Sequence, residues 1–301
     1  MGKQLKFTWK QVVRGSILLL IMNVVFIVGL LGTVLIPKDA VRTSLLRSAD
    51  IMAAESDYAD GLILDIAASQ QADFPFWSII MNPSQMGDGS PEWMPQNIRD
   101  MVAGEVEPDT YYDWVWHGYL TIVKPLLIQC DYSQIRQILI WLVVALALFG
   151  LWQTGMKAGK WGVLFLTVCG ALYFLCVPHT LRYASAATIA FLGLDVLFSR
   201  SRYMEKDGHD YWYFFVIGGI MAFFDHWAPA LAGLIIPLVP WIMFKKRPRK
   251  VRQVVLFTMN RIWGYIAVIG SKWLLCALTF DRDVFLNAEH VLLSFSAFPL
   301  V

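Results

Sequence analysis

Blocks of apolar residues, each about 15 to 25 residues long, recur along most of the chain and limit what it can fold into. A helix of about 20 apolar residues is long enough to cross the hydrocarbon layer of a membrane. Hydrophobic residues make up 57% of the chain and the mean hydropathy is +0.53, more apolar surface than a soluble core of this size could hide. The sequence therefore predicts an all-α integral membrane protein.

We expect seven transmembrane helices in a single membrane domain that covers residues 1–301. The first block is too long for the core of a signal peptide and lacks a clear cleavage site, so we expect it to remain as a helix. A loop of residues 37–136 separates it from a bundle of six helices in residues 137–301. The expected spans are residues 16–36, 137–152, 161–177, 183–198, 211–224, 228–244 and about 262–280.

Basic residues indicate the side of the membrane on which each connection lies, because positively charged loops tend to stay in the cytoplasm. Residues 1–14 carry four bases and no acid, whereas the connections 178–182 and 225–229 hold one base between them. We therefore expect a cytoplasmic N-terminus in the cell membrane and a large extracytoplasmic first loop. Three further connections, which we place in the cytoplasm, are basic at residues 157–160, 200–206 and 245–252.

The first loop, residues 37–136, holds 15 of the chain's 23 acidic residues and only six bases. Residues 42–68 contain one glycine and no proline, and their Ala, Leu, Ile and Met content favours helix. Residues 82–95 are rich in Gly and Pro, which predicts turns. The aromatic run YYDWVWHGY at residues 111–119 is typical of a segment at the membrane interface. We therefore expect a partly helical loop.

Several classes of function lack their sequence signatures. The glycine-rich phosphate loops and the nucleophile elbow of soluble enzymes are absent. The four cysteines have no CxxC spacing, which argues against a zinc site or a disulfide framework. The basic run KKRPRK is explained by topology and anionic lipid rather than by nucleic acid. His117, His179 and His226 fall on three outer connections without a local ligand pair, so we interpret them as polar lining and predict no metal site.

Charged residues near the hydrocarbon are costly, so those retained there are candidate functional groups. Lys272 lies midway along the last expected span, where it either snorkels to the outer headgroups or faces a cavity and binds an anion such as a lipid phosphate. Asp57 and Asp60 lie about 60° apart on a helix and can face one site. One can act as a general base, and the second can orient it or help to bind a divalent metal. The alternative is the solvated acidic face of a loop helix.

Four short motifs together resemble a known group of proteins. In chain order they are a YxDG-like site (Tyr58 to Gly61), WVWHGY (Trp114 to Tyr119) followed by KPLL (Lys124 to Leu127), FFDHWAP (Phe223 to Pro229) and a GY...SKW element (Gly264 to Trp273). With the large outer loop after the first span, they resemble the GT-C superfamily of membrane glycosyltransferases, and more closely a group of bacterial multi-pass proteins. The match covers nearly the whole chain.

The resemblance implies transfer of a sugar from a polyprenyl-phosphate donor to a hydroxyl of a glycan acceptor at the outer membrane face. It implies Asp60, or its neighbour Asp57, as the catalytic base. We expect Lys272 and Arg182 to stabilise the negative charge that develops on the leaving phosphate. The other expected substrate-binding residues form two groups. We expect the sugar or lipid to be held by Tyr112, Trp116, His117 and Tyr119. We expect the opposite side of the substrate site to be closed by Asp225 and His226.

Two other functions would use the same surfaces. A transporter or flippase of lipid-linked saccharides would bind the same lipid without chemistry, and a membrane scaffold would need no pocket. GT-C proteins commonly have more than seven spans, and this chain ends soon after the seventh. We therefore expect the chain to be the N-terminal part of a longer protein.

Overall fold

The computed structural model describes residues 9–55, 58–70, 73–84, 94–176, 180–206, 208–224, 233, 235–244 and 250–280. Nearly all of these residues are helical, which confirms the all-α prediction. The elements are α1 (Trp9–Val34), α2 (Lys38–Glu55), α3 (Tyr58–Ser69), α4 (Pro75–Met81), β1 (Pro83–Ser84), α5 (Met94–Ala103), β2 (Thr110–Tyr111), α6 (Leu120–Leu126), α7 (Tyr132–Cys176), α8 (Leu181–Ser199), α9 (Ser201–Met204), α10 (His209–Phe224), α12 (Ile235–Phe244) and α13 (Lys250–Phe280).

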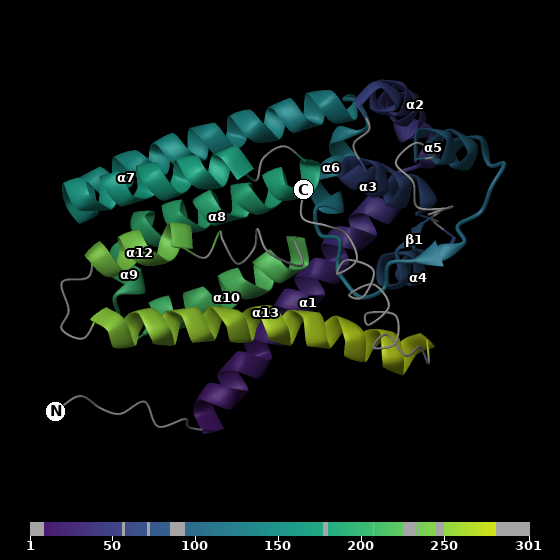
Figure 1. Cartoon of the computed structure of the whole chain (residues 1–301). Helices are drawn as coiled ribbons and strands as arrows, with labels where there is room; N and C mark the ends of the chain where they lie inside the picture. The colour runs from purple at the N-terminus through teal and green to yellow at the C-terminus, as the bar shows by residue number, and fades with distance from the viewer. Residues whose placement is uncertain are drawn as a thin grey trace, which may run out of the picture.

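The helices form two regions (Figure 1). The long helices α7, α8, α10 and α13 run roughly side by side, with α12 beside α7 and α8. The short elements α2 to α6 gather at one end of this bundle, where α7 begins and α13 ends. We call them the outer unit; β1 and β2 pair within it as a two-residue antiparallel ladder, Pro83 opposite Tyr111 and Ser84 opposite Thr110. Helix α1 crosses the bundle and leads into the outer unit.

Helix α7 reverses direction at Gly159. This glycine has φ +73° and ψ −172°, values that break the helix and that a residue with a side chain rarely adopts. The two arms pack closely beside the turn. A Cβ built on Gly162 would lie only 2.8 Å from Cβ of Ala158, so glycine is needed there. The two expected spans 137–152 and 161–177 are thus the arms of one hairpin.

Three of the described helices are long and apolar enough to cross a membrane: Trp9–Val34, Tyr132–Tyr173 and Val251–Phe280. Two shorter apolar helices, Tyr183–Ser199 and Ile235–Phe244, accompany them. These helices are compatible with a membrane protein. The count of seven passes stays a prediction, in part because residues 225–232 lie outside the described residues.

Helices α10 and α13 approach each other through glycines. A Cβ on Gly218 would lie 2.1 Å from the carbonyl oxygen of Arg261, and one on Gly264 would lie 2.0 Å from that of Phe215. Both clashes are with backbone, so the contact requires residues without side chains. This packing fixes α13 against α10, and α13 in turn holds the outer unit.

The acidic stretch of the first loop forms two helices, α2 and α3, and α3 is the centre of the outer unit. Residues 60–69 are all buried, because α2, α5, α6, β1 and α8 surround α3. Gly61 permits this close packing, since a Cβ there would lie 2.9 Å from Cε of Met52 and 3.2 Å from Met94. The acids of α3 are therefore enclosed.

Candidate functional site

Asp60 is bound to the start of α8. Its side chain is fully buried, and Oδ1 accepts a hydrogen bond of 2.6 Å from the backbone N–H of Leu181. Leu181 is the first residue of α8, where backbone N–H groups lack partners within the helix. The carboxylate is thus held at the positive end of the α8 dipole. The alternative of a solvated acidic face is wrong for Asp60.

The same bond brings Asp60 close to the backbone of a predicted phosphate-binding residue. Arg182 follows Leu181 directly, so the residue that accepts from Leu181 lies beside the chain that carries Arg182. The side chain of Arg182 lies outside the described residues, as do the whole of Asp57, Asp225 and His226. Of the two predicted bases, Asp60 is therefore the one whose position the structure describes, and it joins α3 to α8.

Lys272 is fully buried between α13, α4 and the segment that precedes α6. Its Nζ donates to the carbonyl oxygen of Ile79 at 3.3 Å and lies 5.1 Å from the ring centroid of Trp116. Asp113 is within electrostatic reach of the ammonium. The interpretation of Lys272 as a snorkelling residue is wrong, because the side chain is enclosed by protein. Its contacts are with the outer unit, and it stabilises the packing of α13 there.

Residues 113–116 are held on α13 by a series of hydrogen bonds. Nε1 of Trp116 donates to the carbonyl oxygen of Val268 at 3.1 Å, and Nε1 of Trp273 donates to that of Trp114 at 2.9 Å. Both bonds join a tryptophan to backbone, so they fix the position of the chain as well as of the rings. Although the sequence predicted an interfacial segment here, Trp114 and Trp116 are buried.

His117 is the centre of a buried aromatic cluster. Its φ of +55° is uncommon for a residue with a side chain. Nε2 lies 3.1 Å from the carbonyl oxygen of Tyr112, and Nδ1 is hydrogen-bonded to the hydroxyl of Tyr119. The next residue, Gly118, donates its N–H to the carbonyl oxygen of Phe223 at 2.7 Å. The predicted residues Tyr112, His117 and Tyr119 are thus together, and the end of α10 lies against them.

Sequence reasoning gave no role to a buried polar cluster where α1, α6 and the end of α3 meet. Lys124 is fully buried, and its Nζ donates to Oε1 of Gln70 at 2.8 Å. Thr33 donates to the same oxygen at 3.3 Å. Burial, and to a smaller extent the charge of Lys38, lowers the pKa of Lys124 from 10.5 to about 7. The signal in the sequence was a lone lysine within the apolar run TIVKPLL, where a charge is costly.

Replacing Lys124 with Met should stabilise the protein at low pH. Between pH 7 and 10.5 the unfolded chain binds more protons at this site than the folded chain, so the contribution of Lys124 to the free energy of unfolding rises with pH. Below pH 7 the folded protein buries a charged amine. We expect the Tm of Lys124→Met to exceed the wild-type value at pH 6 by about 2 °C or more, and the difference to shrink by pH 9.

Thermal unfolding of the detergent-solubilised protein at the two pH values measures this difference. Lys206→Met, a change of an exposed lysine, is the control and should show no such trend. A Lys124→Met variant that is less stable than wild type at pH 6 would contradict the burial argument.

The described candidate residues fall into two groups of contacts. Asp60 supplies an enclosed carboxylate at a helix N-terminus, and the cluster at His117 supplies rings and hydroxyls on a fixed loop. Among the residues that the structure describes, no group of three His, Cys, Asp or Glu side chains could hold a metal ion. Comparison of the chain with protein-family models, with curated proteins and with solved structures gave no match.

Proposed function

We propose that the chain is a membrane glycosyltransferase that moves a sugar from a polyprenyl-phosphate donor to a hydroxyl of a glycan acceptor. One observation carries the proposal: the buried Asp60 of the first loop is seated on the first residue of α8, immediately before Arg182. An enclosed carboxylate supplies a proton acceptor, and the N-terminus of α8, which it contacts, supplies a phosphate ligand. Those are the two groups that this reaction needs.

Asp60 is the general base of the proposed reaction. It takes the proton of the acceptor hydroxyl as that oxygen forms a bond to the anomeric carbon of the sugar. The bond from this carbon to the phosphate oxygen breaks, and the polyprenyl phosphate leaves with the electron pair. The N–H of Leu181 fixes the orientation of the carboxylate. Arg182 and the positive end of α8 stabilise the charge that grows on the phosphate.

Lys272 has a different task in this proposal from the one that the sequence suggested. Its Nζ is bound to Ile79 and packed on Trp116, so it is a positioning residue that keeps residues 112–119 on α13. The aromatic cluster of Tyr112, His117 and Tyr119 then forms a rigid support beside the sugar.

The proposed topology has seven passes with the N-terminus in the cytoplasm of a cell. The reversal of α7 at Gly159 supports two passes in place of one long helix. The lysines Lys157 and Lys160 flank the turn, as expected on the cytoplasmic side. The outer unit then lies at the extracytoplasmic face, where a lipid-linked sugar would reach Asp60.

The test is conversion of a donor by purified protein in detergent micelles. A panel of polyprenyl-phosphate sugars is incubated with glycan acceptors, and the release of polyprenyl phosphate is followed. We expect release that depends on the acceptor. A flippase needs two compartments, so the same protein is also placed in sealed vesicles. Movement of lipid-linked sugar across the vesicle membrane, with the donor intact in detergent, would overturn the proposal in favour of transport.

A further inference from the structure

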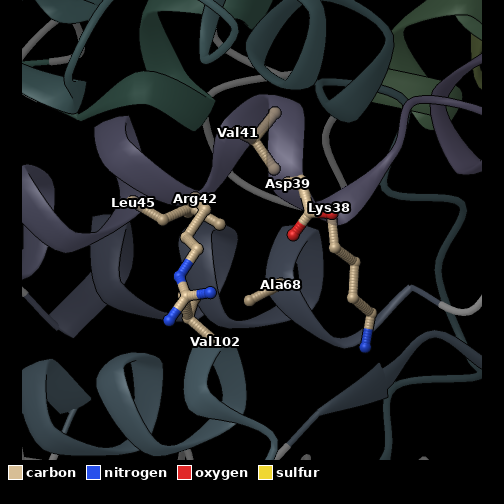
Figure 2. Close-up of a pocket in the computed structure, with 7 residues that line it drawn as sticks. All are labelled: Lys38, Asp39, Val41, Arg42, Leu45, Ala68 and Val102. Carbon is tan, nitrogen blue, oxygen red and sulfur yellow. The ribbon is translucent and has the colours of Figure 1, made fainter.

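Two hollows on the outer unit share one lysine, Lys38 at the start of α2. The first lies between α2, α3 and α5, and Figure 2 shows Lys38 and Arg42 on either side of it above Ala68 and Val102. Its volume is only about 20 Å³, so a ligand would sit at its mouth. Asp39 also lines it. Lys38 and Arg42 are four residues apart, which puts both cations on one side of the helix.

The second hollow is a larger cleft of about 420 Å³ on the other side of Lys38. It carries two carboxylates, Asp73 and Glu107, in addition to the lysine. Both acids are exposed, as are Lys38 and Arg42. The first hollow is thus lined by two cations and one acid, the second by two acids, and Lys38 lines both.

Lys38 and the two acids line the same cleft, and Arg42 lies about one helical turn from Lys38. Within the described part of the chain, Lys38, Arg42, Asp73 and Glu107 make no ion pair within 4.0 Å, whereas Arg99 and Asp50 on the same unit pair at 2.8 Å. A ligand that carries both an anion and a cation would satisfy both sets of charges at once. A headgroup with a phosphate and a primary ammonium has this pattern of charge.

The location favours a membrane lipid as the source of that headgroup. Helix α1 is a candidate membrane span that ends at Val34, and α2 begins four residues later with Lys38. Leu35 between them is 67% exposed, and Phe74 beside Asp73 is 62% exposed. Exposed apolar and aromatic side chains next to charges are typical of the depth at which hydrocarbon meets headgroups.

We propose that the two hollows around Lys38 bind the headgroup of a zwitterionic aminophospholipid, with Lys38 and Arg42 on the phosphate and Asp73 and Glu107 on the ammonium. This site is on the surface of the outer unit and is separate from Asp60. It does not depend on the proposed glycosyl transfer. A lipid bound at this site would fix the distance between the outer unit and the membrane surface.

Lipid binding to the full-length protein in detergent tests the proposal, with bound lipids counted by native mass spectrometry. The probes are phosphatidylethanolamine, phosphatidylglycerol and phosphatidylcholine with the same acyl chains. We expect phosphatidylethanolamine to bind most tightly. Phosphatidylglycerol lacks the ammonium, and the quaternary ammonium of phosphatidylcholine cannot donate hydrogen bonds to carboxylates.

Two double variants separate the roles of the charges. Lys38→Gln with Arg42→Gln should weaken both phosphatidylethanolamine and phosphatidylglycerol by about 5-fold for each charge removed. Asp73→Asn with Glu107→Gln should weaken phosphatidylethanolamine alone, to the level of phosphatidylglycerol. Arg47→Gln, on the opposite side of α2 and 55% exposed, is the matched control and should change neither.

Three results would overturn the proposal. The first is equal binding of the three lipids to wild type, and the second is unchanged phosphatidylethanolamine binding in both double variants. The third is competition by free phosphoethanolamine at the same concentration as the lipid, which would assign the site to a soluble ligand. All four changed side chains are exposed, so the variants should fold, and circular dichroism with a thermal melt checks this.

Discussion

Asp60→Asn should lower glycosyl transfer by about 10²- to 10⁴-fold, the usual contribution of a general base, while the protein remains folded. The amide oxygen of Asn can still accept the hydrogen bond from the N–H of Leu181, so the contact between α3 and α8 is retained. What the change removes is the negative charge and the ability to take a proton. Initial rates of polyprenyl-phosphate release, measured beside the wild type in detergent, give the size of the effect.

Three companion variants show whether the effect belongs to Asp60. Asp60→Ala also removes the acceptor for Leu181, so it should lose stability as well as activity, by about 1 kcal/mol or more. Asp65→Asn changes another buried acid of α3 and should retain transfer. Asp57→Asn tests the neighbouring acid that the sequence left as an alternative. A folded Asp60→Asn protein with a rate within tenfold of wild type would remove Asp60 from the mechanism.

Gly264→Ala should separate α10 from α13 and destabilise the whole bundle. The new Cβ would lie 2.0 Å from the carbonyl oxygen of Phe215, and the backbone of α10 cannot move aside without moving the helix. Overpacking of this kind costs about 1 to 3 kcal/mol, which corresponds to a fall in Tm of roughly 2 to 12 °C. Gly218→Ala should have a similar effect, because its Cβ would lie 2.1 Å from the carbonyl oxygen of Arg261.

Gly270→Ala is the matched control on the same helix. A Cβ at this position would meet nothing within 4 Å, so alanine should be tolerated and should favour the helix slightly. The Tm values of the three variants in one detergent, together with size-exclusion profiles, measure the difference. Equal Tm values for Gly264→Ala and Gly270→Ala would contradict the close packing of α10 on α13.

The sequence was sufficient for the class of fold, because long apolar blocks have few alternatives to membrane helices. It also placed Tyr112, Trp116, His117 and Tyr119 in one group, since these residues are close along the chain. It could not show that Lys272 is enclosed. Burial of a side chain depends on which distant segment covers it, and here the cover comes from Ile79 and Trp116.

The bond between Asp60 and Leu181 shows the same limit more strongly. The two residues are separated by 121 positions, and no local pattern indicates that α3 and α8 meet. Asp57 and Asp60 are three residues apart, so both lie on one side of a helix. This spacing is as typical of a solvated helix face as of a functional site. Contacts that are remote in sequence decided which of these interpretations holds for Asp60.

The turn at Gly159 also sets the length of apolar helix that this chain would present to a membrane. As one straight rod, α7 would be about 67 Å long at 1.5 Å per residue, more than twice the hydrocarbon thickness. Lys157 and Lys160 lie beside the turn, and a charged side chain within the hydrocarbon is costly. The reversal therefore halves the helix length that a membrane must accommodate and leaves both ammonium groups at the end of the hairpin, where they can reach water at one membrane surface.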